Sequence, residues 1–264
     1  MENECVLLML GCDKNIDLVE LNLDMIKRFW PDCPFPVYIS LETYHGNYGD
    51  NIKIMNSNET KWSKRIMEHL AGLNSKYVMI TLDDFIIEDF VHTQTVVDCI
   101  NFMNENPQVV NMAFDAFNGK RIPGKDFKHF QCRKKRSNCL LNWQIGLWRT
   151  DNLIELMDPN ENPWESEVFG SMRAELKKES QFYCLDVKMH KPIEYNNGWL
   201  VVRGCWNGNE IKRLEQKLNI KIDTGDRLIK YKDFQYISFF PRVKRRLKII
   251  FKRYNYKIKS RLEA

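Results

Sequence analysis

The sequence contains no apolar run long enough to cross a membrane as a helix. The longest run, Cys5–Leu10, is followed by Gly11 and falls well short of the roughly 20 residues that a bilayer requires. Disorder is excluded as the main state, because hydrophobic residues make up 44% and aromatic residues 12% of the 264-residue chain. A chain of this length and composition forms one large or two small domains with a substantial core.

Patterned cysteines and several catalytic motifs are also missing. The eight cysteines include no C-x-x-C pair, so we interpret them as reduced structural thiols, and without a recognisable signal peptide we expect a cytoplasmic protein. The sequence has no G-x-x-x-x-G-K-[ST] loop, no G-x-G-x-x-G after its first predicted strand and no G-x-S-x-G. These absences argue against P-loop nucleotide hydrolysis, dinucleotide redox chemistry and serine hydrolysis.

The net charge of +5 is concentrated at one end of the chain. Residues 241–264 contain ten basic residues and one acidic residue, which leaves the first 240 residues net negative. Apolar residues recur there every three or four positions, so the segment predicts a basic amphipathic helix. Such a helix can lie on an anionic membrane surface. A terminal helix packed on the domain is the alternative, and nucleic acid is a less expected partner because the stripe is aromatic and aliphatic.

Strands and helices alternate over the first 115 residues. Apolar runs predict strands at 5–12, 37–41, 52–55, 77–82 and 109–114, and helical spacing predicts helices at 18–29, 62–73 and 93–104. This order predicts a doubly wound α/β unit. Residues 118–137 turn polar and basic, and we interpret them as a flexible excursion. Further strands are expected at 140–149, 182–187 and 199–202, and further helices at 152–157, 164–177 and 209–218.

Two adjacent carboxylates, Asp83 and Asp84, follow the predicted strand at 77–82. Ligands of open α/β sheets bind at the carboxyl ends of strands. Two carboxylates there repel each other unless a cation or a cage of hydrogen bonds compensates them. Mg²⁺ or Mn²⁺ suits the position, since such ions combine one or two carboxylates with phosphate oxygens and water. The pair therefore predicts binding of a nucleoside diphosphate, with a purely structural capping role as the alternative.

The order of these elements and motifs resembles the GT-A glycosyltransferases, particularly the small enzymes of bacterial capsule and O-antigen gene clusters. The matching positions are Asp13 with Lys14, the helix with Trp62, Ser63 and Arg65, the LDDF segment at 82–85, and Trp164-Glu165-Ser166-Glu167. The resemblance covers about residues 3–210 and implies a Rossmann-like mixed sheet with helices on both faces. LDDF departs from the family's Asp-x-Asp motif, which leaves open which aspartate holds the cation and whether the cation is obligatory.

The resemblance implies a set of donor-binding residues. The loop after the first strand and the end of the second strand receive the nucleoside in this family, which here means Gly11, Asp13 and Glu42. Trp62 and Arg65 lie three apart on one predicted helical face, so Arg65 could reach a phosphate while Trp62 packs beneath the base. A core tryptophan with a solvated arginine is the alternative.

The cation and the leaving group have expected partners as well. By the resemblance, Asp83 and Asp84 hold Mn²⁺ or Mg²⁺ and the donor diphosphate, and His190 supplies a third metal ligand. A lone histidine is otherwise commonly structural. Arg203, which lies beside a glycine, is expected to close over the diphosphate and stabilise the leaving group.

Inverting transfer to a sugar hydroxyl requires a carboxylate base. The family places this base at the opening of a helix after the acceptor-side strand, where this sequence has Glu165 and Glu167. Residues two apart cannot share a helical face, so at most one of them points into the site. We favour Glu167 over Glu165 and Asp115. Both glutamates could instead only stabilise the helix start through its dipole.

Tryptophans near this helix are candidates for an acceptor platform. Trp143 and Trp148 lie in the predicted strand before the helix, and Trp164 lies at its start. Aromatic faces can pack on the C–H faces of sugars, although tryptophan in a strand is often part of the core. Gly146 would let a ligand approach the backbone closely.

Together these features predict a membrane-associated glycosyltransferase that moves a sugar from a nucleotide sugar to a lipid-linked glycan. The expected organisation is a domain over 1–238, with a nucleotide-binding half at 1–115 and an acceptor half at 116–238, and a basic membrane-associating tail at 239–264. A nucleotidyltransferase on a related fold is an alternative, although GCDKN poorly matches the glycine-rich loop of such enzymes. A non-catalytic module that binds lipid or nucleic acid through the tail is another.

Overall fold

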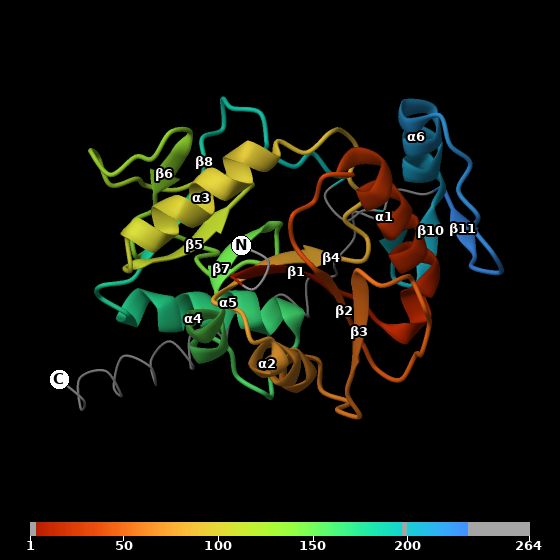
Figure 1. The fold of residues 1–264 in the computed structure, drawn as a ribbon, viewed down its shortest axis with the longest axis horizontal. Coiled ribbons are helices and arrows are strands. Elements are labelled where there is room, and N and C mark those ends of the chain that lie inside the picture. The colour runs from red at the N-terminus through yellow and green to blue at the C-terminus, as the bar shows by residue number, and fades with distance from the viewer. Residues whose placement is uncertain (1–3, 197–199, 232–264) are drawn as a thin grey trace.

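The computed structural model describes residues 4–196 and 200–231. A mixed sheet runs through the molecule with the strand order β3-β2-β1-β4-β7-β5-β8-β6. Its strands, in chain order, are β1 (Cys5–Leu10), β2 (Val37–Leu41), β3 (Ile52–Asn56), β4 (Tyr77–Leu82), β5 (Val109–Ala113), β6 (Phe130–Cys132), β7 (Gly146–Arg149) and β8 (Gln181–Leu185). Figure 1 shows helices above and below this sheet.

Both faces of the sheet are buried, which explains the continuous apolar runs in the sequence. Along β1, Cys5, Leu7 and Met9 enter one core while Val6, Leu8 and Leu10 enter the other. The first core also contains α1 (Ile16–Phe29), α3 (Thr93–Glu105) and α6 (Gly208–Leu218), and the second contains α2 (Trp62–Gly72), α4 (Thr150–Glu155) and α5 (Pro163–Leu176). The expected α/β class, with a mixed sheet and helices on both faces, is therefore confirmed.

The direction of β7 determines what reaches the carboxyl edge of the sheet. Strands β3, β2, β1 and β4 are parallel, whereas β7 runs antiparallel to both of its neighbours, β4 and β5. The segment that precedes β7 therefore lies at the edge where β4 and β5 end. Gly146 is needed for strand packing, because a Cβ there would lie 2.7 Å from the carbonyl oxygen of Met112. This corrects the expectation that Gly146 makes room for a ligand.

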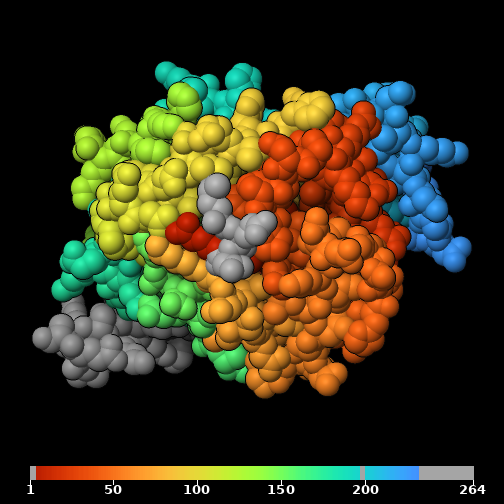
Figure 2. All heavy atoms as spheres, viewed as in Figure 1, coloured from red at the N-terminus to blue at the C-terminus, as the bar shows by residue number. Residues whose placement is uncertain are grey.

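A small second sheet lies beside α1, formed by β9 (Val201–Val202), β10 (Cys205–Asn207) and β11 (Ile229–Lys230). Arg203 and Gly204 join β9 to β10 with φ angles of 52° and 75°, as a two-residue hairpin turn requires. Figure 2 shows these late residues, in blue, against the flank of the red and orange N-terminal part.

Several predicted elements differ from the observed ones. Residues 118–137, expected to be a flexible excursion, include β6 and are fixed by the buried Arg133, whose guanidinium donates to the carbonyl oxygens of Asn138 and Cys139. The predicted strand at 140–149 is a strand only from Gly146 onward. No described helix is long and apolar enough to span a membrane. The predicted tail at 239–264 lies outside the described residues.

Candidate functional site

The candidate site lies at the carboxyl edge of the sheet. Gly11 follows β1, Glu42 follows β2, Asp83 follows β4, and Asp115 lies two residues beyond β5. Gly11 fits closely beneath this edge, since a Cβ on it would lie 3.1 Å from Val19 and 3.2 Å from Leu41. The topology thus gathers four of the residues that the sequence pointed to.

Asp13 ties the loop after β1 to the loop after β2. Its carboxylate accepts the backbone N–H of Glu42 at 3.0 Å and both the backbone N–H and the hydroxyl of Thr43 at 2.9 and 2.8 Å. In return, the backbone N–H of Asp13 donates to Glu42 Oε2 at 2.6 Å. Burial acts to raise the pKa of Asp13, but the hydrogen bonds from Thr43 outweigh it and lower that pKa. These two loops therefore form one fixed surface beside the acidic pair.

Arg65 supports this surface from below. Its side chain pairs with Glu42 and donates to the carbonyl oxygen of Gly11 at 3.1 Å, and the residue is only 4% exposed. Burial lowers its pKa. The sequence left a phosphate ligand and a solvated charge as the two options for Arg65, and the structure instead gives it a buried contact with the loops after β1 and β2.

Asp83 and Asp84 occupy the end of β4 in an environment that disfavours their charged forms. Asp83 is 8% exposed and accepts a hydrogen bond from Asn15 Nδ2 at 3.0 Å. Burial and the neighbouring Asp84 raise the pKa of Asp83 to about 7, and burial raises that of Asp84 to about 6. Neither carboxylate forms an ion pair with any residue that the structure describes. The pair can therefore accept positive charge from a bound cation.

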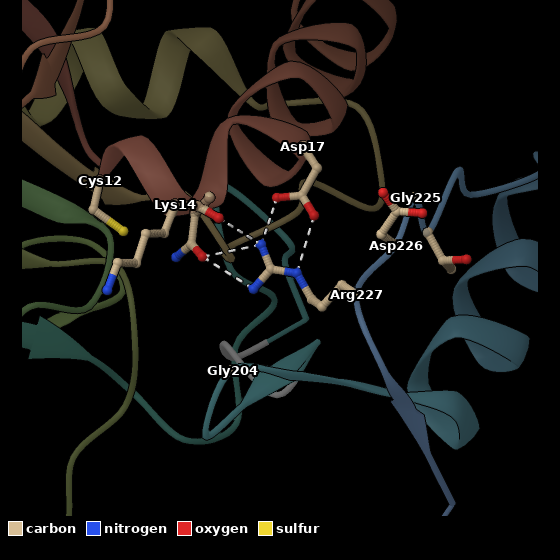
Figure 3. Close-up of a pocket in the computed structure, with 9 residues that line it drawn as sticks. Cys12, Lys14, Asp17, Gly204, Gly225, Asp226 and Arg227 are labelled. Carbon is tan, nitrogen blue, oxygen red and sulfur yellow. Dashed lines mark hydrogen bonds and ion pairs between the residues drawn. The ribbon is translucent and has the colours of Figure 1, made fainter.

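Figure 3 shows a pocket of about 590 Å³ whose lining begins with the loop after β1. One of its lining residues is Asn15, which donates to Asp83 and so places the pocket beside the acidic pair. We call it the Arg227 pocket, and it is lined by Cys12, Lys14, Asn15, Asp17, Gly204, Thr224, Gly225, Asp226 and Arg227.

Arg227 forms one wall of this pocket and contacts residues more than two hundred positions earlier in the sequence. Its guanidinium forms a two-point ion pair with Asp17 at 2.7 and 3.0 Å and donates to the carbonyl oxygen of Lys14 at 2.8 Å and to Asn15 Oδ1 at 3.2 Å. Arg227 thereby fixes the residue that orients Asp83. Sequence reasoning missed Arg227, because no local pattern links it to Asp17.

Trp62, Trp143 and Glu167 lie at the carboxyl edge of the sheet, near the segment that precedes β7. Trp62 packs edge-on against Trp143, with ring centroids 4.9 Å apart. Glu167 Oε1 accepts the backbone N–H of Trp143 at 3.1 Å, which holds this carboxylate near the start of β7. Trp143 and Trp148 are 3% and 0% exposed, so both are core residues and the expected acceptor platform is wrong for them. Trp164, by contrast, is 66% exposed.

Glu165 has a structural role at the start of α5. Its backbone N–H donates to Asn162 Oδ1 at 3.0 Å, and its own carboxylate accepts the backbone N–H of Asn162 at 3.4 Å. This reciprocal arrangement is a capping box with proline in the first turn. The alternative role that the sequence allowed for Glu165 therefore agrees with the structure.

Asp115, the third candidate base, belongs to a hydrogen-bonded cluster. Lys191 Nζ lies 3.2 Å from its carboxylate, and the Tyr195 hydroxyl donates to the same oxygen at 3.2 Å. Tyr195 Oη also lies 2.8 Å from Gln144 Oε1, so the cluster joins the end of β5 to the segment before β7.

The remaining predicted residues are placed on loops. His190 is exposed in the turn after β8, and within the described ranges no group of three His, Cys, Asp or Glu side chains could hold a metal ion. His190 therefore does not form such a group with Asp83 and Asp84 among the described residues. Arg203 is exposed at the tip of the β9–β10 hairpin, next to Gly204 of the Arg227 pocket.

No family model matches the chain, and no curated protein matches it. Solved structures show partial likeness. TarS 1-349 of S. aureus in complex with UDP-GlcNAc is 16% identical over 72% of this chain and 60% of that chain, with a TM-score of 0.44. This chain thus spans about 60% of the length of that TarS fragment.

Two further structures represent two kinds of transferase. Mannosyltransferase PcManGT from Pyrobaculum calidifontis, in complex with GDP-Man and Mn²⁺, is 11% identical over 83% of this chain and 62% of that chain, with a TM-score of 0.46. A cytidylyltransferase from Leptospira borgpetersenii is 11% identical over 63% of this chain and 68% of that chain, with a TM-score of 0.37. Solved glycosyltransferases are thus among the structures that this chain resembles.

Proposed function

We propose that this protein is a glycosyltransferase that takes a sugar from a nucleotide-sugar donor and transfers it to a glycan acceptor. The observation that carries the proposal is the acidic pair of the buried Asp83 and the partly buried Asp84, which lies beside the Arg227 pocket at the carboxyl edge of parallel strands. Open α/β sheets bind ligands at this edge. A volume of about 590 Å³ lies within the range of pockets for nucleotide-sized ligands.

The acidic pair suits a divalent cation bound together with a diphosphate. Asp83 and Asp84 offer oxygen ligands, and Mn²⁺ or Mg²⁺ can take its other ligands from phosphate and water. A bound cation would stabilise the charged forms of two carboxylates whose pKa values burial has raised. When bound, such a cation neutralises the charge that develops on the departing diphosphate. Asn15, held by Arg227, keeps Asp83 oriented toward this role.

Glu167 is our proposal for the base that deprotonates the acceptor hydroxyl. Its carboxylate accepts the backbone N–H of Trp143, three residues before β7, in the segment that lies at the carboxyl edge of the sheet. The carboxylate of Glu165 is engaged in the capping box, and that of Asp115 is engaged by Lys191 and Tyr195. The exposed Trp164, three residues before Glu167, would contact the acceptor sugar.

The basic segment at the end of the chain bears on which acceptor the enzyme uses and where the enzyme acts. We propose a lipid-linked glycan of cell-surface polysaccharide synthesis, with residues 239–264 holding the enzyme at the anionic inner face of the cell membrane. The support is the sequence of that segment, in which ten basic residues between 241 and 264 surround an apolar stripe.

Calorimetric titration tests the donor site. UDP, GDP, UDP-GlcNAc and GDP-mannose are titrated with and without Mn²⁺ into the wild type, Asp84→Asn and Asp24→Asn. Asp24 is 69% exposed on α1 and serves as the matched control. We expect one nucleobase to bind in a Mn²⁺-dependent manner, at least about tenfold more weakly in Asp84→Asn and equally well in Asp24→Asn. At 100 times its dissociation constant the ligand adds about 2.7 kcal/mol of stability, which a melting curve detects.

Two outcomes would contradict the proposal. If none of the nucleotides binds with or without Mn²⁺, the acidic pair is not a donor site. If the protein instead consumes a nucleoside triphosphate and a sugar phosphate with release of pyrophosphate, the reaction is nucleotidyl transfer.

A further inference from the structure

A second pocket lies outside the proposed donor site, within the polar segment at 118–138. Its volume is about 730 Å³, and four of its nine lining residues are basic while none is acidic. We call it the basic pocket, and its cations are Lys120, Lys134, Lys135 and Arg136. Neither the acidic pair nor any of the predicted site residues lines it.

The walls of the basic pocket are fixed by hydrogen bonds. The backbone N–H of Lys134 donates to the carbonyl oxygen of Lys120 at 3.0 Å, which joins the two walls. Arg133 donates to Asn138 and Cys139, and the ammonium group of Lys135 donates to the carbonyl oxygens of Lys177 and Ser180. The pocket is therefore preformed, and a ligand would bind without first ordering its walls.

The charge in this pocket is not compensated by the protein. Lys120, Lys134 and Arg136 are exposed, and none of them forms an ion pair with any described residue. Ser137, which also lines the pocket, is 7% exposed, and its hydroxyl has no hydrogen-bond partner among the described residues. This hydroxyl is therefore available to hydrogen-bond a ligand bound in the pocket. An anion with several oxygen atoms would satisfy the hydroxyl and the cations together.

Both walls of the basic pocket continue along the chain to the part of the sheet edge where we propose that the acceptor binds. One wall starts three residues after Asp115, and the other continues through Cys139 toward Trp143, whose backbone N–H is bound by Glu167. We propose that the basic pocket binds phosphate groups carried by the acceptor, an inference that rests on the proposed glycosyl transfer. Three unpaired cations and a hydroxyl match the several oxygen atoms and double charge of phosphate better than a single carboxylate.

Pyrophosphate binding in the presence of EDTA tests this site directly. Without a divalent cation the acidic pair repels pyrophosphate, so binding to the full-length chain reports on its basic surfaces. The test variant combines Lys134→Gln with Arg136→Gln. The control combines Lys27→Gln on α1 with Lys53→Gln on the edge strand β3, which removes the same charge elsewhere. The tail is present in every variant, so its contribution is a common background.

We expect calorimetry to give about tenfold weaker pyrophosphate binding in the test variant, and unchanged binding in the control variant and in Asp84→Asn. Ser137→Ala should weaken binding severalfold without changing the melting temperature by more than about 2 °C. Equal losses in test and control variants, or no pyrophosphate binding at all, would overturn the proposal. So would vesicles of phosphatidylglycerol that bind through Lys134 and Arg136 while pyrophosphate does not.

This experiment separates the inference from the proposed function. Nucleotide binding with Mn²⁺ should be the same in the wild type and in the Lys134→Gln, Arg136→Gln variant, because the Arg227 pocket shares no lining residue with the basic pocket. A protein that binds nucleotide but not pyrophosphate keeps the donor site and loses only this inference.

Discussion

His69 is a buried titratable residue on α2, beneath the loops of the candidate site. Its Nδ1 lies 2.7 Å from the hydroxyl of Ser40 on β2, and the residue packs between the helix and the sheet. Burial lowers the pKa of this imidazole below its usual value, because the charged form is poorly solvated there. The folded protein therefore holds His69 neutral at a pH where the unfolded chain has begun to take up a proton.

Replacing His69 by Gln should flatten the acid dependence of stability. The unfolded chain protonates near pH 6.5, so wild-type stability is complete above that pH and falls as pH decreases toward the lower folded-state pKa. Between pH 7.5 and 5.5 we expect the wild type to lose more of its free energy of unfolding than His69→Gln does, as measured by urea unfolding. The control, His45→Gln, changes an exposed histidine and should follow the wild type. Parallel pH profiles for wild type and His69→Gln would contradict this assignment.

For single residues of the site, the sequence predicted where they lie on their helix or strand, but not which groups they contact. Helical spacing correctly placed Trp62 and Arg65 near each other on the second helix, but it does not reveal what the neighbouring loops offer. Arg65 faces Glu42 and a backbone carbonyl, and Trp62 faces Trp143. These partners are 23 and 81 residues away in sequence, so only the fold determines them.

At the scale of elements, α5 separates the two glutamates that the sequence could not distinguish. Glu165 is the third residue of the helix and closes the capping box, whereas Glu167 lies two residues further on and turns toward Trp143. A capping box accepts glutamine as readily as glutamate. Glutamine at either position therefore preserves the helix while removing the capacity to accept a proton.

Glu167→Gln should lower the rate of sugar transfer by a factor of about 10² to 10⁴, because general base catalysis contributes that range. Donor affinity should stay unchanged, and Glu165→Gln should retain both stability and transfer. Steady-state transfer assays and donor calorimetry on the two variants measure this difference. Should Glu165→Gln be the inactive one, or should both remain active, the base lies elsewhere, and Asp115→Asn becomes the informative variant.

Element prediction succeeded where one segment carries its own periodic signal. The strands β1, β2 and β4 and the helices α1 and α2 are all evident from apolar runs and helical spacing. The short strands β6, β10 and β11 were missed, because two or three residues show no period and their pairing depends on distant partners. The antiparallel direction of β7 was also beyond prediction, since apolar runs indicate burial but not strand direction.

At the scale of the whole molecule, we predict that the basic tail binds anionic membranes whether or not the protein is catalytically active. Deleting residues 241–264 removes ten basic residues and the apolar stripe. Binding to phosphatidylglycerol vesicles should be lost in the deletion, and in the full chain it should weaken as salt rises beyond about 0.15 M, where screening acts over about 8 Å. Cosedimentation measures both effects, with phosphatidylcholine vesicles as the neutral control. Donor binding should survive the deletion; vesicle binding that persists without the tail would contradict its role.

Contacts between distant parts of the chain were the least predictable features. Arg227 and Asp17 are 210 residues apart in sequence, and an isolated arginine in a polar segment carries no signal for its partner. The same holds for Glu88, which pairs with Arg213 and Lys217 and so attaches α6 to the loop after β4. The sequence therefore predicts the sheet and the acidic pair, while the closing wall of the pocket depends on tertiary packing.

The late position of Arg227 has a consequence for synthesis on the ribosome. All eight strands of the main sheet are complete by Leu185, whereas Gly204 and residues 224–227 supply one wall of the pocket. A nascent chain can therefore assemble its sheet while the pocket still lacks that wall. The pocket is therefore complete only when residue 227 has left the exit tunnel, and we expect the proposed nucleotide binding to be absent from shorter translation products.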